Sequence, residues 1–157
     1  MWILVLIGAG VLSALVHLYV IGGFQAGIST IFEIIVLHQF IVTNGLIGVL
    51  GFYINVIKAD DTAKSLGWPG GPFQIKYGFS QLGLGVMGVL SIWFKGPFWL
   101  GTLITMYIYG ASGLWTHTQE MMKKGKFDAI EFANIVLDII YHVVITIMLF
   151  QVPGVFR

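Results

Sequence analysis

The stretch Asp128–Gln151, DAIEFANIVLDIIYHVVITIMLFQ, decides the fold. It is mostly apolar and slightly longer than the roughly 20 residues that cross the hydrocarbon core of a bilayer as a helix. Its polar residues recur every three or four positions, at Glu131, Asn134, Asp138 and His142. This spacing places them on one face of a helix, and polar groups inside a span must face protein or water. The stretch therefore predicts a membrane-spanning helix that packs within a bundle.

Four more apolar segments precede this one, over residues 1–20, 29–57, 74–94 and 98–118. Together with residues 128–151 they predict an all-α integral membrane protein, a compact bundle of five transmembrane helices that forms one domain over residues 1–157. The first segment has no Lys or Arg before its apolar run and no small-residue cleavage site after it, so we expect a retained helix and not a signal peptide.

The composition supports a membrane protein. Of 157 residues, 57% are hydrophobic and 10% are charged, whereas a soluble domain has about 25% charged residues. The chain has no Cys, which excludes disulfides, thiolate metal sites and iron–sulfur clusters. A net charge of +1 with eight Lys and Arg residues argues against nucleic-acid binding. The expected surroundings are the lipid bilayer and other membrane-protein subunits, or further copies of the chain.

The distribution of basic residues predicts the orientation. Short cytoplasmic loops are enriched in Lys and Arg. The loops after the second and fourth segments contain most of them, at Lys58, Lys64, Lys76, Lys123, Lys124 and Lys126. The opposite side has only Lys95 and Arg157. We therefore expect a cytoplasmic N-terminus and an external C-terminus, with Trp93 and Trp99 at the outer interface.

Ionisable residues inside the spans are the candidate functional groups, because burial of such groups in hydrocarbon is costly. At a rise of about 1.5 Å per residue, His17, His38 and His142 all fall in the outer half of the membrane. These three histidines are candidate metal ligands. Glu33 and Asp138 are the nearby carboxylates, the first closer to the outer interface and the second closer to the midplane.

The other polar residues divide into two groups. Those expected in the polar core of the bundle are Glu33, Asn44, Gln81, Asn134 and Asp138. The residues expected near the cytoplasmic interface are His117 and Glu131. Rows of Gly, Ser and Thr on the other helices are typical of helix packing surfaces in membranes.

Several kinds of chemistry fit the histidines and carboxylates. They suit a divalent metal such as Zn, Cu or non-haem Fe, two axial ligands for a b-type haem, or a proton relay. Pairing across the bundle with a purely structural role is the simpler interpretation. No motif decides between them, since no helix has two His at i and i+4 and there is no H-E-x-x-H sequence.

Three segments carry a family resemblance. They are the loop Leu66–Gln74 with the following Lys76-Tyr-Gly-Phe79 and Gln81–Leu90, the stretch Tyr109–His117, and Asn134–Asp138. Over roughly residues 45–150 the chain resembles small uncharacterised bacterial and archaeal membrane proteins, classed as a domain of unknown function near the DoxX-like proteins. The resemblance implies a helical bundle in a prokaryotic inner membrane and a link to respiratory or sulfur redox complexes. The missing Cys and the extra N-terminal helix depart from that pattern and argue against a thiol-based redox role.

Two functions follow as expectations. The first is a small accessory protein or subunit of a larger membrane complex, with a respiratory or redox connection implied by the resemblance. The second is a membrane metal-binding, haem-binding or proton-relay protein that uses the intramembrane histidines and carboxylates. An enzyme is the less expected outcome, because no catalytic motif is present.

Overall fold

The computed structural model describes residues 2–124 and 128–156; the side chains at positions 2, 120, 124 and 131 are outside this description. Every regular element in the described residues is helical, which confirms the predicted all-α class. Three segments are long and apolar enough to cross a membrane: Ile3–Val20, Gly27–Ile57 and Phe132–Phe150. The structure thus agrees with a membrane protein, while the two remaining long helices, α5 and α6, are less apolar.

Helix α1 (Trp2–Val20) is joined by a short 3₁₀ turn, η1 (Gly23–Gln25), to α2 (Gly27–His38). Gly22 and Gly27 flank this turn with φ of 66° and 79°, which glycine adopts without the steric cost of a Cβ. The chain therefore reverses within a few residues, and α2 packs back on α1. A small apolar cluster of Ala14, Leu18 and Ile34 forms their interface.

The second predicted helix is a single helical run that changes type along its length. It consists of α2, the π-helical η2 (Gln39–Asn44), α3 (Gly45–Phe52) and the π-helical η3 (Tyr53–Ile57). A π turn widens a helix and rotates the residues that follow. In η2 it turns the polar side chains of Gln39, Thr43 and Asn44 into the protein, where all three are buried.

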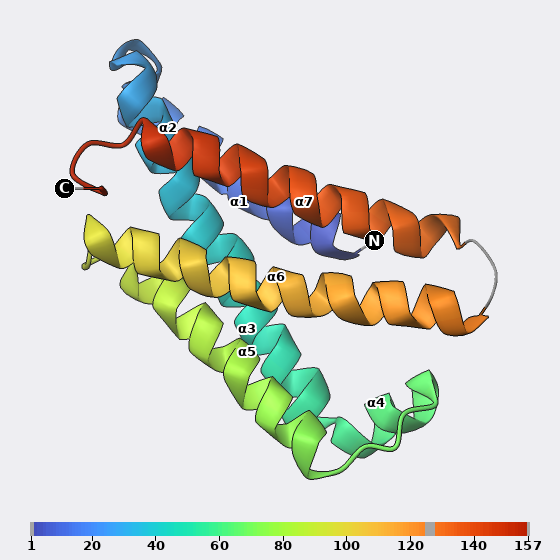
Figure 1. The fold of residues 1–157 in the computed structure, drawn as a ribbon. Coiled ribbons are helices and arrows are strands. Elements are labelled where there is room, and N and C mark those ends of the chain that lie inside the picture. The colour runs from blue at the N-terminus through green and yellow to red at the C-terminus, as the bar shows by residue number, and fades with distance from the viewer. Residues whose placement is uncertain (1, 125–127, 157) are drawn as a thin grey trace.

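Helix α5 (Pro72–Leu90) lies directly against this run (Figure 1). Glycine allows the contact: a Cβ on Gly48 would lie 2.6 Å from the Gly85 Cα, and one on Gly88 would lie 2.2 Å from the Phe40 carbonyl oxygen. The helix begins two residues before the predicted start at 74 and ends four residues before the predicted end at 94. Pro72 occupies the first helical position, which proline favours. After Leu90, the backbone N–H groups of Ser91, Ile92 and Trp93 form the tighter i to i−3 hydrogen bonds of a 3₁₀ turn.

A short helix, α4 (Ala59–Leu66), lies within the loop expected after the second segment and connects the run to α5. Asp60 and Asp61 lie in its first turn, where carboxylates interact favourably with the helix dipole. Gly67 ends it with a φ of 67°, the left-handed conformation that glycine commonly supplies after a helix.

Helices α6 (Pro97–Lys124) and α7 (Ala129–Phe150) form an antiparallel hairpin (Figure 1). The α6 helix continues six residues past the predicted end at 118, because a helix need not end where its apolar span ends. The main core lies where α6 and α7 meet η2. Trp99, predicted at the lipid interface, is instead fully buried there against Phe40 and donates a hydrogen bond of 3.0 Å to the Ser91 carbonyl.

Candidate functional site

A cavity of about 430 Å³ lies between the helices, and every α-helix except α2 contributes to its lining. The larger part of its wall is apolar. The polar residues in the lining are Asn44, Asn55, Thr62, Tyr77, Gln81, Tyr109, His117, Asn134, Asp138, Tyr141 and His142. Of the predicted polar core, Asn44, Gln81, Asn134 and Asp138 thus line one cavity, and Glu33 does not.

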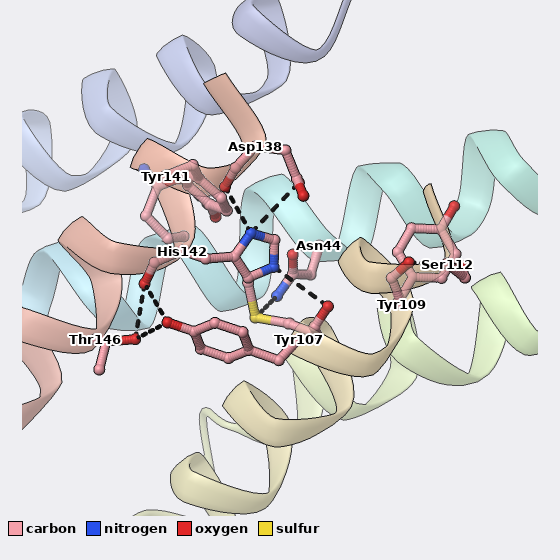
Figure 2. A network of polar contacts seen from close by, with 10 residues as sticks. Asn44, Tyr107, Tyr109, Ser112, Asp138, Tyr141, His142 and Thr146 are labelled. Atoms are coloured by element: carbon pink, nitrogen blue, oxygen red, sulfur yellow. Dashed lines mark hydrogen bonds and ion pairs between the residues drawn. The ribbon is translucent and has the colours of Figure 1, made fainter. Parts of the chain in front are cut away.

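One helical turn of α7 supplies a carboxylate and an imidazole to this cavity. Asp138 and His142 are four residues apart, so their side chains lie on one face. The His142 Nδ1 is 2.8 Å from the Asp138 carbonyl oxygen and 3.3 Å from its carboxylate Oδ1. The His142 Nε2 is 3.2 Å from the Met106 carbonyl oxygen of α6. Figure 2 shows the ring held between Asp138 and α6.

Both ring nitrogens of His142 have oxygen partners. Nδ1 lies near the Asp138 carbonyl and carboxylate oxygens, and Nε2 lies near the Met106 carbonyl oxygen. A carbonyl oxygen only accepts hydrogen bonds, so each ring N–H that is present has an acceptor within the protein. These contacts fix the position of the ring in the cavity wall.

Helix α6 shapes the same region. A Cβ on Gly110 would lie 2.8 Å from His142 Cε1 and 3.0 Å from Asp138 Oδ2, so only glycine leaves room for the pair. The Tyr107 ring packs on the imidazole at a centroid distance of 4.9 Å. The Tyr107 hydroxyl bonds to Thr146 Oγ1 at 2.8 Å, so the tyrosine ring is held against His142 by a residue one turn further along α7 (Figure 2).

A second polar group lines the cavity from α5 and α6. Asn55 Nδ2 donates to Gln81 Oε1 at 2.8 Å, and Gln81 Nε2 in turn donates to the hydroxyl of Tyr109. The Tyr109 hydroxyl also bonds to that of Tyr77 at 2.9 Å. The Gln81 amide uses both its acceptor and its donor, so this chain of four side chains joins η3, α5 and α6.

The remaining lining residues differ in their contacts. Asn44 is buried and its Nδ2 lies 2.9 Å from the sulfur of Met106. Among the described residues, the side chain of Asn134 makes no hydrogen bond, although it lines the cavity. His117, predicted near the interface, also lines the cavity. The side chain of Glu131, the other interfacial candidate, is outside the described residues.

Two of the three candidate metal ligands meet at a separate place. The His17 Nδ1 lies 2.8 Å from His38 Nε2, and His38 Nδ1 lies 2.7 Å from the hydroxyl of Ser13. This row, which we call the histidine chain, joins α1 to α2. His142 belongs to the cavity instead. Within the described part of the chain, no three His, Asp or Glu side chains are grouped to hold a metal ion.

Glu33 has a partner of its own. Its carboxylate accepts a hydrogen bond of 2.7 Å from Lys95, in the turn between α5 and α6. Both side chains are partly exposed, so Glu33 takes part in a surface ion pair and not in the polar core.

Sequence reasoning missed some of the polar residues. Gln39 and Thr43 bond to each other at 2.8 Å and to the α1 backbone, and Tyr141 donates to Gln39 Oε1 at 3.2 Å. The spacing of Gln39 and Thr43, four residues apart in an apolar segment, is a signal that could have identified this pair. Tyr77 and Tyr141 carry no such signal, because tyrosines are common in membrane helices.

The sequence matches the profile of a family described as a family of unknown function (DUF6790), over residues 1–153. No curated protein and no solved structure gives a significant match. The relation to DoxX-like proteins therefore stays a prediction.

Proposed function

This chain belongs to the family of unknown function DUF6790, and we propose that it is a small integral-membrane accessory subunit of a larger membrane complex. In this proposal α1, the run 27–57, α5, α6 and α7 all cross the bilayer. The N-terminus is cytoplasmic and the C-terminus external, in the inner membrane of a prokaryote. The observation that carries the accessory role is how little of the described chain lies outside the five helices.

Contacts at one end of the bundle support five crossings. Glu33, early in the second crossing, pairs with Lys95 between α5 and α6. Ser29, in the same helix, donates a hydrogen bond of 2.8 Å to the Gln151 carbonyl after α7. The α1–α2 connection, the α5–α6 turn and the end of α7 thus share one end of the molecule (Figure 1). Each of the five long helical segments therefore runs between this end and the opposite end of the molecule, and successive segments run in opposite directions. Five crossings require this arrangement.

The small extramembrane part supports an accessory role. Large apolar side chains on α1, α6 and α7 face outward, for example Val5 at 70%, Ile108 at 68% and Ile147 at 57%, where they contact lipid or a partner subunit in this proposal. The described residues outside the five helices comprise α4 and short turns, which leaves no extramembrane catalytic domain among them. A respiratory or redox partner complex is proposed on the resemblance to DoxX-like proteins.

Photo-crosslinking in the native membrane tests this role. Benzoylphenylalanine replaces Val5, Ile108 or Ile147, one exposed position on each of three helices, and replaces the buried Leu103 as the control. We expect a discrete adduct with one partner subunit from one helix face, and none from Leu103. If none of the exposed positions gives an adduct and the extracted protein has the mass of one chain, the accessory role is wrong.

The histidine chain supports a second function, a proton relay. Ser13, His38 and His17 can each accept a proton on one side and donate one on the other. A metal fits this arrangement less well. Two imidazole nitrogens that share one Zn²⁺ in tetrahedral geometry lie about 3.3 Å apart, given Zn–N distances of about 2.0–2.1 Å. The observed 2.8 Å is a hydrogen-bond distance, and a haem iron would need still more room.

Proton flux into vesicles tests the relay. The purified chain is reconstituted with a pH-sensitive dye inside, and a potassium diffusion potential drives proton entry. We expect His38→Gln to lower the flux about tenfold or more. Ser13→Ala should also lower it, whereas the matched Ser80→Ala should not, because Ser80 bonds only to the Lys76 carbonyl of its own helix. A wild-type flux equal to that of protein-free vesicles would reject the relay.

A further inference from the structure

We propose that the cavity is a binding site for an uncharged, membrane-soluble amphiphile, whose head group bonds to the polar side chains of α7 and whose aliphatic body lies against the apolar walls. This inference concerns the chain alone and does not depend on the accessory role or on the histidine chain.

The size of the cavity fits such a molecule. Its volume of about 430 Å³ lies within the range of about 300–1,000 Å³ that is typical of small-molecule sites. Such sites are mostly apolar, with a few polar groups that orient the ligand. Here the apolar walls include Ile47 and Ile54 of the run 27–57 and Leu114 of α6.

The charge of the lining favours a neutral head group. Asp138 is the only Asp, Glu, Lys or Arg among the described lining residues. Its carboxylate lies 3.3 Å from His142 Nδ1, so it already has a partner within the protein. A cation or an anion entering the cavity would leave its own charge without a partner, at a high cost in a site of low polarity. A hydroxyl or carbonyl head group avoids this cost.

Hydrogen-bonding groups for such a head group are present. The side chain of Asn134 lines the cavity and makes no hydrogen bond within the described residues, so its amide can both donate and accept. Asp138, one turn further along α7, is also partly exposed, at 36% of its side chain. The two together provide a donor and acceptors on one face of α7.

Two glycines of α6 provide a matched test. A Cβ on Gly113 or on Gly101 would meet nothing within 4 Å, so both positions have space for a larger side chain. Gly113 lines the cavity and Gly101 does not. Gly113→Leu is therefore expected to fill the cavity, whereas Gly101→Leu adds the same side chain to the same helix outside it.

The probe is 3-azioctanol, a photoactivatable eight-carbon alcohol, applied to the purified full chain in lipid nanodiscs. Labelled residues are identified by peptide mass spectrometry, with 1-octanol and octyltrimethylammonium as competitors. We expect saturable labelling of cavity residues that 1-octanol suppresses at lower concentration than the cationic competitor does. Gly113→Leu should reduce this labelling about tenfold, equivalent to about 1.4 kcal/mol of binding free energy, and Gly101→Leu should leave it unchanged.

Three results would overturn the proposal. They are labelling that does not saturate, labelling confined to outward-facing residues, and equal labelling of the two glycine variants when both remain folded by circular dichroism. Equal competition by the cationic amphiphile would overturn the neutral specificity. None of these results bears on photo-crosslinking to a partner subunit, so this proposal and the accessory role fail separately.

Discussion

Gly88 shows how a single missing side chain positions two helices. A Cβ at this position would lie 2.2 Å from the Phe40 carbonyl oxygen, a backbone atom that cannot move without its helix. We expect Gly88→Ala to lower the free energy of unfolding by about 1–3 kcal/mol, the typical cost of overpacking. Gly83→Ala is the control on the same helix, since a Cβ there meets nothing within 4 Å. Unfolding by SDS titration in micelles measures both, and equal losses would contradict the close contact.

The Asp138 and His142 pair differs from the Glu33 and Lys95 pair in the exposure of the basic partner. The His142 side chain is 9% exposed and Lys95 is 55% exposed, whereas the two carboxylates are similar, with Asp138 at 36% and Glu33 at 31%. We expect Asp138→Asn to lower the free energy of unfolding by about 1–3 kcal/mol, because it removes the carboxylate that contacts a buried imidazole nitrogen. Glu33→Gln should cost no more than about 1 kcal/mol, as is usual for exposed pairs. The same SDS titration compares them, and a larger loss for Glu33→Gln would refute the assignment.

At the residue scale, the sequence predicted which polar groups face inward better than it predicted their partners. The stripe on α7 follows from a three- and four-residue spacing, a local property, and Asn134, Asp138 and His142 do line one cavity. The three histidines were grouped by depth alone. Depth leaves the direction of a side chain around its helix open, so His142 could not be separated from His17 and His38 before the packing was known.

At the element scale, the contact between η2 and α1 depends on Thr43. Its hydroxyl contacts the Leu6 carbonyl at 3.2 Å and the Gln39 side chain at 2.8 Å. Thr43→Val keeps the shape and removes these bonds, so we expect a loss of about 0.6 kcal/mol, the average measured for interhelical bonds in membranes, and no more than about 1.7 kcal/mol. Thr105→Val is the matched control, because among the described residues the Thr105 side chain bonds to Gly101 of its own helix alone. Equal stability of the two variants, measured by thermal unfolding in detergent, would contradict a role for this contact.

The limits of prediction at this scale have a common cause. Hydropathy marks apolar segments, so it indicated the long helices but not α4, whose composition is polar. The π turns η2 and η3 have no local signal in an apolar sequence. They follow from contacts of Gln39 and Thr43 with α1 and of Asn55 with Gln81 on α5, residues distant in the chain. The end of α5 was misplaced because Ile92, Trp93 and Phe94 are as apolar as the helix before them.

At the scale of the whole molecule, hydropathy alone and the packing give different numbers of crossings. Three segments are apolar enough to span by themselves. In α5, the polar Gln74 and Gln81 are buried and lower the mean hydropathy without facing lipid. With 28 residues α6 extends about 42 Å, more than a hydrocarbon core of about 30 Å. With 19 residues α5 extends about 28 Å, close to that thickness and within the range of about 17–25 residues found for spanning helices. Five crossings and three crossings place each terminus on the same side of the membrane. They differ in the side on which the α5–α6 turn lies.

That turn supplies the decisive measurement. With five crossings Lys95 is external, together with Glu33, and with three it is cytoplasmic. Because the chain has no Cys, a single introduced Cys is the only thiol. We expect a membrane-impermeant maleimide to label Lys95→Cys in intact cells, since the exposed ion pair that this change removes contributes no more than about 1 kcal/mol.

Ser65→Cys, on the exposed side of α4, is the control for the opposite side of the membrane. Five crossings place it in the cytoplasm, so the same reagent should label it only after the cells are permeabilised. Three crossings predict that Lys95→Cys behaves as Ser65→Cys does, with labelling of both after permeabilisation alone. That result would also remove the α5–α6 turn from the side that holds Glu33 and Gln151. The run 27–57 spans the membrane in both cases, so a cytoplasmic α5 could not pack along it as observed, and the cavity that α5 helps to line would not form in the bilayer.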